Sequence, residues 1–260
     1  MRKTEEPKLA MVLAYHEVMP QSNYAYCVTC ENFAEQLSLL NSLSQDAGSP
    51  LGARITFDDG EQSQYRNALP LLAKQGISAM YFVNPGLVGT EGKFLSWEQL
   101  RELQTAGHSI QSHGWSHKFL ISCQGEEFAQ ELGGSRETLE DKLGSAVEEI
   151  SVPGGRWDER VIEACARAGY KRVYVSEPWI ATEMCGVKVI GRFMVRRTTT
   201  IAELTKMIQR DEHALWALKL RSQLKQRLVS LVGDDFYHRV WCRLTGYNEF
   251  EAARRQDDYS

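Results

Sequence analysis

The order of short apolar runs and amphipathic stretches along the chain constrains its fold more than any other feature. Seven runs have strand character, and stretches with helical spacing lie between them. The predicted strands are 9–15, 54–57, 78–83, 109–111, 149–152, 172–175 and 188–195, and the predicted helices are 31–43, 62–74, 96–106, 126–143, 158–168 and 200–210. Strict alternation predicts a parallel sheet with crossover helices, and seven strands favour a barrel over an open sheet. We therefore expect an α/β fold, a distorted (β/α)7 TIM-like barrel.

Glycines support the helix boundaries. Gly76, Gly107 and Gly169 each stand just after a predicted helix and before a predicted strand. A residue in the left-handed conformation commonly ends a helix at this position, and glycine adopts it without steric cost. Each glycine is therefore predicted to end a helix that leads into the next strand.

Length and charge bound the remaining possibilities. The chain has 260 residues and a formal net charge of −4, with 43% hydrophobic and 25% charged residues. These values are typical of a globular protein and give no reason to expect nucleic acid as a partner. The charged start lacks an apolar signal-type segment, and no run approaches the roughly 18 apolar residues of a membrane span. We therefore expect a cytoplasmic protein, with residues 1–211 as the barrel and 212–260 as a helical C-terminal extension.

Residues 213–232 have a composition of their own. The segment carries Lys219, Arg221, Lys225 and Arg227 and no acidic residue, with an apolar side formed by Leu215, Leu218, Leu224, Leu228 and Leu231. One interpretation is a helix that packs on the barrel. The other is a basic amphipathic helix that lies peripherally on an anionic membrane, at its inner face.

Two polar stretches follow predicted strands and carry candidate chemistry. Asp58 and Asp59 end one strand and precede Gly60. Adjacent carboxylates repel each other unless a cation or solvent relieves them, although an Asp-rich turn that caps a helix has the same composition. His113 and His117 follow a later strand, four residues apart, and this spacing places both imidazoles on one side of a turn. Two imidazoles and one carboxylate form a three-ligand metal site with an open position for water.

Two further motifs are less specific. Pro153-Gly154-Gly155 lies between a predicted strand and helix, where glycines allow close approach of the backbone to a ligand, although a plain loop is equally compatible. Cys27 and Cys30 form a CxxC pair without a second pair. A structural zinc site needs four ligands, so we interpret these two cysteines as structural.

Taken together, these stretches resemble the successive motifs of the polysaccharide deacetylase (NodB-homology) family. Thr56-Phe57-Asp58-Asp59-Gly60 matches its TFDDG motif, and residues 107–117 match its histidine motif, with Ser109 in place of glutamate and Gly114 in place of a small hydroxyl residue. Pro153 and Gly155 match a P-x-G motif, followed by Gly169-Tyr170, and residues 15–18 match an N-terminal YHxV. The resemblance spans roughly residues 8–210 and implies a distorted (β/α)7 barrel.

The resemblance also implies roles. Asp58 is expected as general base, and Asp59, His113 and His117 as ligands of a divalent metal, with Zn²⁺ as the expected ion. The cation would polarise the acetyl carbonyl and acidify water, and Asp58 would accept the proton. A backbone N–H near Gly154 is a candidate for stabilising the oxyanion. The expected reaction is removal of the N-acetyl group from an amino sugar in a polysaccharide, an oligosaccharide or a lipid-linked precursor of exopolysaccharide.

Two departures from the family pattern are visible. Many members carry an arginine two residues before the motif proline, where it orients the base, and here that residue is Ser151. Arg192, Arg196 and Arg197 near the last strand are candidate replacements, with Arg196 preferred as a substrate-site residue. The late Leu-x-His motif that supplies a general acid is also missing, because no histidine lies between His117 and His213. His16 is a candidate substitute, although a structural role also suits it.

Two other functions remain open at this point. Without its usual acid and arginine, the barrel could bind glycans with weak or no turnover; retention of Asp58 argues against this, since binding alone needs no base. Facial-triad Fe(II) oxygenases also use two histidines and a carboxylate. They usually place the acid two residues from a histidine on a β-sandwich, a pattern that differs from the one in this sequence.

Overall fold

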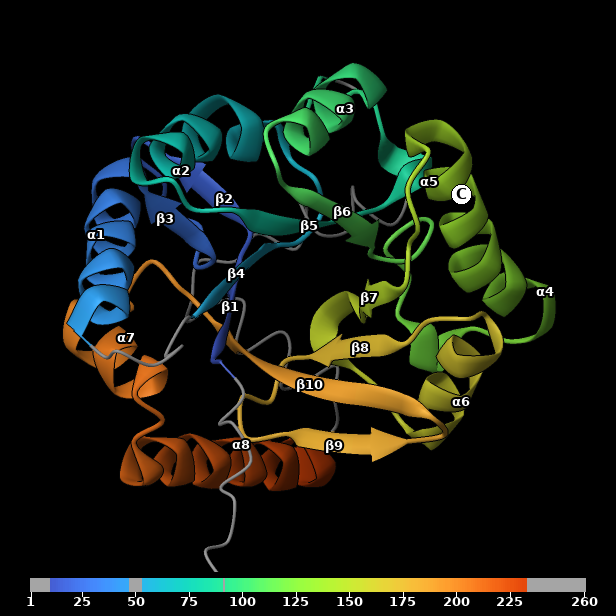
Figure 1. The fold of residues 1–260 in the computed structure, drawn as a ribbon. Helices are drawn as coiled ribbons and strands as arrows, with labels where there is room; N and C mark the ends of the chain where they lie inside the picture. The colour runs from blue at the N-terminus through green and yellow to red at the C-terminus, as the bar shows by residue number, and fades with distance from the viewer. Residues whose placement is uncertain (1–9, 47–52, 91, 233–260) are drawn as a thin grey trace, which may run out of the picture.

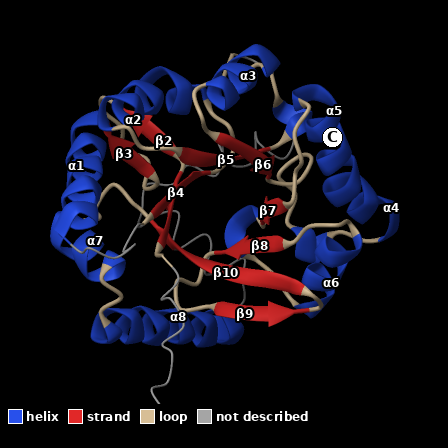
Figure 2. Ribbon diagram, viewed as in Figure 1, coloured by secondary structure: helices blue, strands red, loops and turns tan. Residues whose placement is uncertain are grey.

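The structure is a computed structural model that describes residues 10–46, 53–90 and 92–232. Seven parallel strands close into a barrel, because the first strand, β1 (Val12–Tyr15), pairs with β4 (Arg54–Phe57) on one side and with β10 (Val187–Met194) on the other. The barrel strands are β1 (Val12–Tyr15), β4 (Arg54–Phe57), β5 (Ala79–Val83), β6 (Ser109–Ser112), β7 (Glu149–Ser151), β8 (Arg172–Val175) and β10 (Val187–Met194). All seven predicted strands are present, so the expected seven-stranded α/β barrel is confirmed (Figures 1 and 2).

Helices form an outer ring around these strands (Figure 1). Ser96 caps α3 (Trp97–Thr105) through a reciprocal capping box with Gln99, and the side chains of Asp158 and Thr200 cap α6 (Glu159–Arg167) and α7 (Ile201–Ile208). The α-helices are α1 (Cys30–Asp46), α2 (Leu69–Gln75), α3 (Trp97–Thr105), α4 (Gly125–Phe128), α5 (Ser135–Leu143), α6 (Glu159–Arg167), α7 (Ile201–Ile208) and α8 (Glu212–Val232). Short 3₁₀ turns lie at Pro85–Leu87, Leu120–Ser122 and Pro153–Gly155.

Two predicted helices contain wider turns than expected. The stretch 62–74 begins as a π-helical segment, Gln64–Ala68, before α2. The stretch 126–143 is interrupted by a second π-helical segment, Ala129–Gly134, between α4 and α5. A π turn rotates the residues that follow it relative to an α-helix and is frequent near functional sites. Both segments matter for the site, because each supplies a side chain that contacts it.

Three short strands were not predicted. β2 (Glu17–Met19) and β3 (Cys27–Thr29) form a small parallel pair outside the barrel. β9 (Ala181–Met184) pairs with β10 in an antiparallel hairpin through a tight turn at Cys185 and Gly186, both with positive φ. Cys27 lies buried in β3 and Cys30 begins α1, and both thiols are free, so the CxxC motif spans a strand-to-helix junction.

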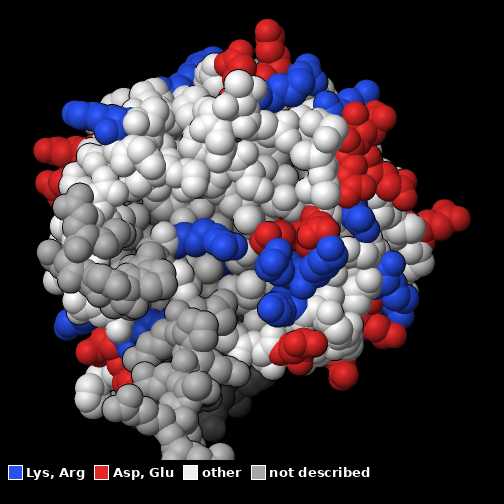
Figure 3. Space-filling model, viewed as in Figure 1, with Lys and Arg blue, Asp and Glu red and all other residues white. Residues whose placement is uncertain are grey.

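The two ends of the barrel differ in chemistry. The interior holds a small apolar cluster formed by Val12, Met80, Phe82, Tyr174 and Ile190. At the end where the strands begin, Glu149 accepts a hydrogen bond from Arg172 at 3.0 Å and from the Tyr174 hydroxyl at 2.5 Å. Acidic and basic side chains are interspersed on the face seen in Figure 3. The opposite end, where the strands finish, carries the residues described in the next subsection.

Helix α8 lies across the side of the barrel next to α7 (Figure 1). Leu215 and Leu218, predicted to be on its apolar side, pack against the core. Trp216 and Leu224 are instead 64% and 55% exposed. Within the described part of the chain, we find no helix of the length and apolarity that a membrane crossing needs. Residues 1–9 of the predicted barrel domain and 233–260 of the predicted extension lie outside the described residues.

Candidate active site

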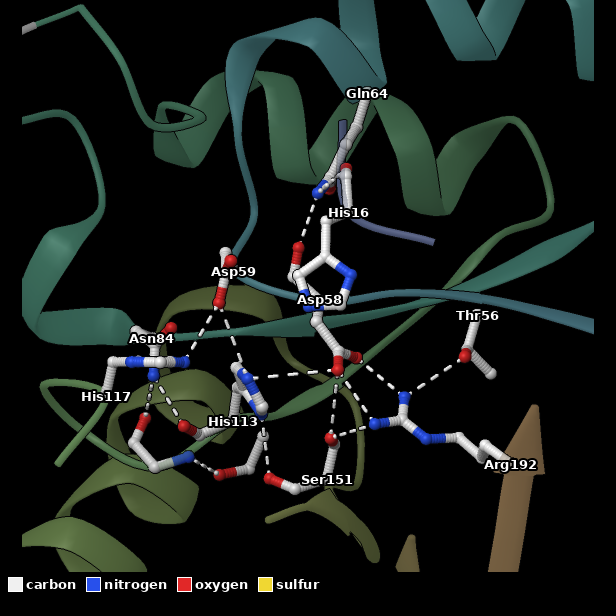
Figure 4. A network of polar contacts seen from close by, with 12 residues as sticks. His16, Thr56, Asp58, Asp59, Gln64, Asn84, His113, His117, Ser151 and Arg192 are labelled. Carbon is white, nitrogen blue, oxygen red and sulfur yellow. Dashed lines mark hydrogen bonds and ion pairs between the residues drawn. The ribbon is translucent and has the colours of Figure 1, made fainter. Parts of the chain in front are cut away.

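The candidate site is built where the parallel strands end. Asp58 and Asp59 follow β4, and the Asp58 N–H donates to the Tyr15 carbonyl at the end of β1. His113 follows β6, and its N–H donates to the Val83 carbonyl at the end of β5. The carboxyl ends of parallel strands meet at one rim of a barrel, so residues far apart in sequence converge there. Figure 4 shows these side chains pointing toward one another.

Asp59 and His117 have strained backbones. Their φ angles are 73° and 65°, in the left-handed region that residues other than glycine rarely adopt. Such a conformation costs roughly 1–2 kcal/mol for an L-residue. Two of the four non-glycine residues with positive φ in the described chain therefore lie in this one site. Backbone strain of this kind concentrates at ligand-binding and catalytic positions.

Asp59, His113 and His117 form a compact donor set. The Asp59 Oδ1 atom lies 3.4 Å from Nε2 of His113 and 3.2 Å from Nε2 of His117. One ligand atom from each residue lies within 4.8 Å of the others, and this is the one such group among the described residues. Two imidazole nitrogens and one carboxylate oxygen match the donor set of zinc sites that keep an open position.

The hydrogen bond on the far side of His113 fixes how its ring is used. Nδ1 lies 2.8 Å from the Ser151 carbonyl, which can only accept, so Nδ1 carries the hydrogen. In the neutral ring, Nε2 then presents a lone pair toward the Asp59 carboxylate. Two electron-rich atoms face each other, an arrangement that a cation between them would relieve. This hydrogen bond to the second nitrogen is the usual support of a metal-ligating histidine. The residues present therefore fit a divalent metal.

Asp58 is held by a buried arginine. Arg192 projects from β10, and its Nη1 and Nη2 atoms donate to Oδ1 and Oδ2 of Asp58, both at 2.7 Å. The guanidinium also donates to Thr56 Oγ1 at 3.1 Å and Ser151 Oγ at 2.7 Å, and it lies over the Phe82 ring. Arg192 is 1% exposed and Asp58 3%. A two-pronged pair of this kind fixes the plane of the carboxylate as well as its charge.

The ionisation of the site follows from these contacts. Burial raises the pKa of Asp58, but the positive charges of Arg192 and His113 outweigh burial and lower it to about 2. Burial likewise raises the pKa of Asp59, and His117 and His113 reverse this and hold it well below its usual range. Burial lowers the pKa of His113, whereas the Asp58 and Asp59 charges raise it above its ordinary value. Both carboxylates are therefore ionised at neutral pH, which a cation site requires.

The remaining predicted residues lie at different distances from this centre. His16 follows β1, its ring packs 5.2 Å from the Tyr26 ring, and its Nδ1 is buried without a hydrogen-bond partner. Burial lowers the pKa of His16, opposed by the Asp59 and Asp58 charges. Arg196 does not reach Asp58 and lies 5.5 Å over the Tyr26 ring instead. Gly154 has a φ of 63°, and a Cβ there would meet the Phe119 ring at 2.4 Å, so this position requires glycine.

Several supporting residues have no motif to reveal them. Gln64 donates from Nε2 to the Asp58 and His16 carbonyls, at 2.5 and 2.9 Å. Asn84 donates to the His113 and Gly114 carbonyls at 2.5 and 3.2 Å. Glu131 accepts from the loop between the two histidines. These contacts tie the strand ends and the histidine loop into one network, and Figure 4 shows the part of it that involves Gln64 and Asn84.

Comparisons with known proteins point to one family. Residues 50–173 match the family model described as polysaccharide deacetylase. Bacillus subtilis YxkH, a candidate polysaccharide deacetylase, is 27% identical over 208 residues, 74% of this chain and 74% of that protein. A chitooligosaccharide deacetylase of Sinorhizobium fredii is 24% identical over 144 residues, 55% of this chain and 65% of that protein. The Streptococcus pyogenes deacetylase PplD, solved in complex with acetate, is similar with a TM-score of 0.69 at 21% identity over 78% of this chain and 99% of that one.

Proposed function

We propose that this chain acts as the polysaccharide deacetylases to which it is similar, and that it removes the N-acetyl group of an amino sugar with a divalent cation, Zn²⁺. The observation that carries the proposal is that candidate metal ligands and an oriented carboxylate lie together at one rim of the barrel. Asp59, His113 and His117 offer metal ligands, and the adjacent Asp58 is ionised and held in one orientation. A barrel that only bound glycans would have no use for a buried, oriented carboxylate beside the metal ligands.

A cation at this site would polarise the acetyl carbonyl and acidify a water molecule. Asp58 then acts as the general base that accepts the proton of that water. Arg192 keeps the Asp58 carboxylate ionised and fixes its direction, so that the carboxylate is positioned before substrate arrives. We propose Gly154 as the region whose backbone N–H groups stabilise the developing oxyanion, because its left-handed turn follows β7 at the same rim.

The leaving amine needs a proton, and His16 is the histidine we propose to deliver it. It follows β1 at the rim of the site, and both aspartates influence its charge. Its Nδ1 is buried without a partner, so the ring has hydrogen-bonding capacity that the fold does not use. Burial favours the neutral ring, which can accept the proton that Asp58 has taken from the attacking water and then donate it to the leaving amine. Arg196, above the Tyr26 ring that packs on His16, is proposed to contact substrate.

The family and one relative support a substrate class. The similar Sinorhizobium fredii protein is named a chitooligosaccharide deacetylase, which supports an N-acetylated amino sugar over an O-acetyl ester. We propose an oligosaccharide, polysaccharide or lipid-linked glycan precursor, such as one used in exopolysaccharide assembly. Acetate release from N-acetylglucosamine oligomers and from lipid-linked precursors, measured side by side, tests this assignment.

Metal content gives the first test of the site. We expect the purified protein to bind one divalent cation per chain. The double variant His113→Ala, His117→Ala should lose this binding, because a single carboxylate cannot hold the ion. His213→Ala is the matched control, since this exposed histidine lies on α8. Metal stoichiometry is measured by elemental analysis after dialysis, and an unchanged stoichiometry in the double variant would show that the ion lies elsewhere.

We also propose that α8 attaches the barrel to an anionic membrane, with a different surface from the one its leucines predicted. Trp216, Leu220 and Leu224 recur at four-residue spacing and share one helix face, all exposed. Lys219 and Arg221 are exposed on either side of this stripe. Aromatic and aliphatic side chains flanked by basic ones suit the interface of an anionic bilayer, where each basic residue contributes about 1 kcal/mol. Such attachment would bring the site near lipid-linked glycans.

Liposome co-sedimentation tests this attachment. We expect the full chain to sediment with vesicles containing phosphatidylglycerol at low salt, and to bind less as salt screens the charges. The triple variant Trp216→Ser, Leu220→Ser, Leu224→Ser should stay in the supernatant, and Ile121→Ser, another exposed apolar position, should bind as the parent does. A parent chain that remains in the supernatant at low salt would contradict the proposal. Loss of a dimer in the triple variant would instead identify the stripe as a contact between two copies.

A further inference from the structure

The loop between the two candidate ligand histidines is held by a buried carboxylate outside any motif. Glu131 comes from the π-helical segment Ala129–Gly134 and is 3% exposed. Its Oε2 accepts the Trp115 N–H at 2.8 Å and the Ser116 N–H at 3.0 Å. Its Oε1 accepts the Ser116 hydroxyl at 2.5 Å. One side chain therefore binds three donors in the loop that joins His113 to His117.

Gly114 makes room for this carboxylate. A Cβ at Gly114 would lie 3.0 Å from Oε2 of Glu131, and the residue has a φ of 78°. The sequence resemblance placed a small hydroxyl residue at this position in the family pattern, where this chain has glycine. The glycine that departs from the family pattern is therefore the residue against which the Glu131 carboxylate packs.

Residues other than Glu131 donate hydrogen bonds to the carbonyl groups of the loop. Asn84 Nδ2 donates to the His113 and Gly114 carbonyls, and the Ser135 hydroxyl donates to the Gly114 carbonyl at 3.1 Å. The Gly86 N–H donates to the Trp115 carbonyl at 3.0 Å. These contacts satisfy carbonyl groups, whereas Glu131 satisfies N–H groups. Loss of Glu131 would leave backbone donors without their partner, which is costly in a closely packed loop.

The two histidines depend on this loop to different degrees. His113 is fixed by its place at the end of β6 and by the hydrogen bond of Nδ1 to the Ser151 carbonyl. The His117 side chain is 31% exposed, and its backbone has a φ of 65°. Its position next to Asp59 is therefore set mainly by the residues before it, two of which bind Glu131.

We propose that Glu131 is a positioning residue for the metal site, because its carboxylate fixes the turn that brings His117 to Asp59. This inference rests on the proposed metal site and adds a residue to its support. Partners that orient metal ligands typically change metal affinity by about 10- to 100-fold when they are replaced. A purely structural residue would instead lower the melting temperature and leave the affinity of the folded protein unchanged.

The test compares Zn²⁺ affinity of full-length wild type, Glu131→Gln and Glu137→Gln by competition with a chromophoric chelator. Glutamine has one acceptor oxygen in place of two and cannot satisfy all three donors. We expect Glu131→Gln to bind Zn²⁺ about 10- to 100-fold more weakly. Glu137→Gln, an exposed carboxylate in the first turn of α5, removes the same charge and should bind as wild type does. The absorption spectrum of Co²⁺ in the site should change only in Glu131→Gln.

The outcomes separate this inference from the proposed function. Equal Zn²⁺ affinity in wild type and Glu131→Gln would overturn the role of Glu131 while leaving the metal site intact. A wild-type chain that binds no Zn²⁺ would overturn the metal site itself. If Glu131→Gln does not fold, Ser116→Ala decides, since it removes one donor to the same carboxylate. We expect weaker Zn²⁺ binding in that variant, and unchanged binding would count against the role.

Discussion

Asp58→Asn is expected to reduce acetate release from N-acetylglucosamine oligomers by about 10²- to 10⁴-fold, the usual contribution of a general base. The amide keeps the shape of the side chain but cannot accept the proton of the attacking water. Metal binding should persist, because Asp59, His113 and His117 are unchanged. The measurement is the rate of acetate release at saturating metal, alongside the metal content of the same sample. Turnover close to wild type would remove Asp58 from the mechanism.

A second large effect is expected at Arg192. Arg192→Ser should lower turnover by about 10²-fold, the cost of misplacing a reacting group by about 1 Å. It should also destabilise the fold by about 3–5 kcal/mol in urea unfolding, because the Asp58 charge is left buried without its partner. Arg196→Ser is the matched control, since its guanidinium lies over Tyr26 and not against Asp58. Wild-type turnover in Arg192→Ser would contradict the orienting role.

Moving the arginine from position 192 to position 151 extends this second prediction. Ser151 Oγ lies 2.7 Å from Nη2 of Arg192, so position 151 borders the space that the guanidinium fills. This is also the position at which the family pattern carries its arginine. Adding Ser151→Arg to Arg192→Ser should restore part of the lost turnover and stability, because the guanidinium would reach Asp58 from β7 and not from β10. If neither turnover nor stability is restored, the strand from which the guanidinium projects matters as well as its charge.

The barrel was predictable because its strands are set by local pattern. Most residues of the seven strands are buried, as in β5, and glycines such as Gly76 end helices in the left-handed conformation as expected. β9 escaped prediction because it is an exposed edge strand, held by pairing to β10 rather than by an apolar pattern. β2 and β3 have three residues each, too few for a periodicity to show.

The site was predictable where motifs carry it and not elsewhere. Asp58, Asp59, His113 and His117 lie together, as their spacing after strands indicated. Alternation along β10 places Arg192 on the same inner face as Ile190, a signal that favours it over Arg196 beyond the strand end. Glu131 gave no signal, because the π-helical turn around it breaks the helical spacing from which its direction would be inferred.

For the C-terminal helix, composition predicted the element but not the face that it buries. Its basic and apolar content predicted a helix, and α8 is one. Composition did not show which apolar residues the barrel would cover. Leu215 and Leu218 pack on the core, whereas Trp216 is exposed, because the orientation of α8 is set by its contact with α7 and the barrel. Packing on the barrel and contact with a membrane therefore concern two different faces of one helix.

If deacetylation by this chain depends on a metal, acetate release should stop when the metal is removed and resume when it is returned. The protein is stripped with a chelator, dialysed and assayed on N-acetylglucosamine oligomers, then reloaded with one equivalent of Zn²⁺ and assayed again. We expect the stripped protein to release no acetate above background and the reloaded protein to recover its activity, with no recovery in His113→Ala, His117→Ala. Full activity after complete metal removal would show that this chain deacetylates its substrate without a metal.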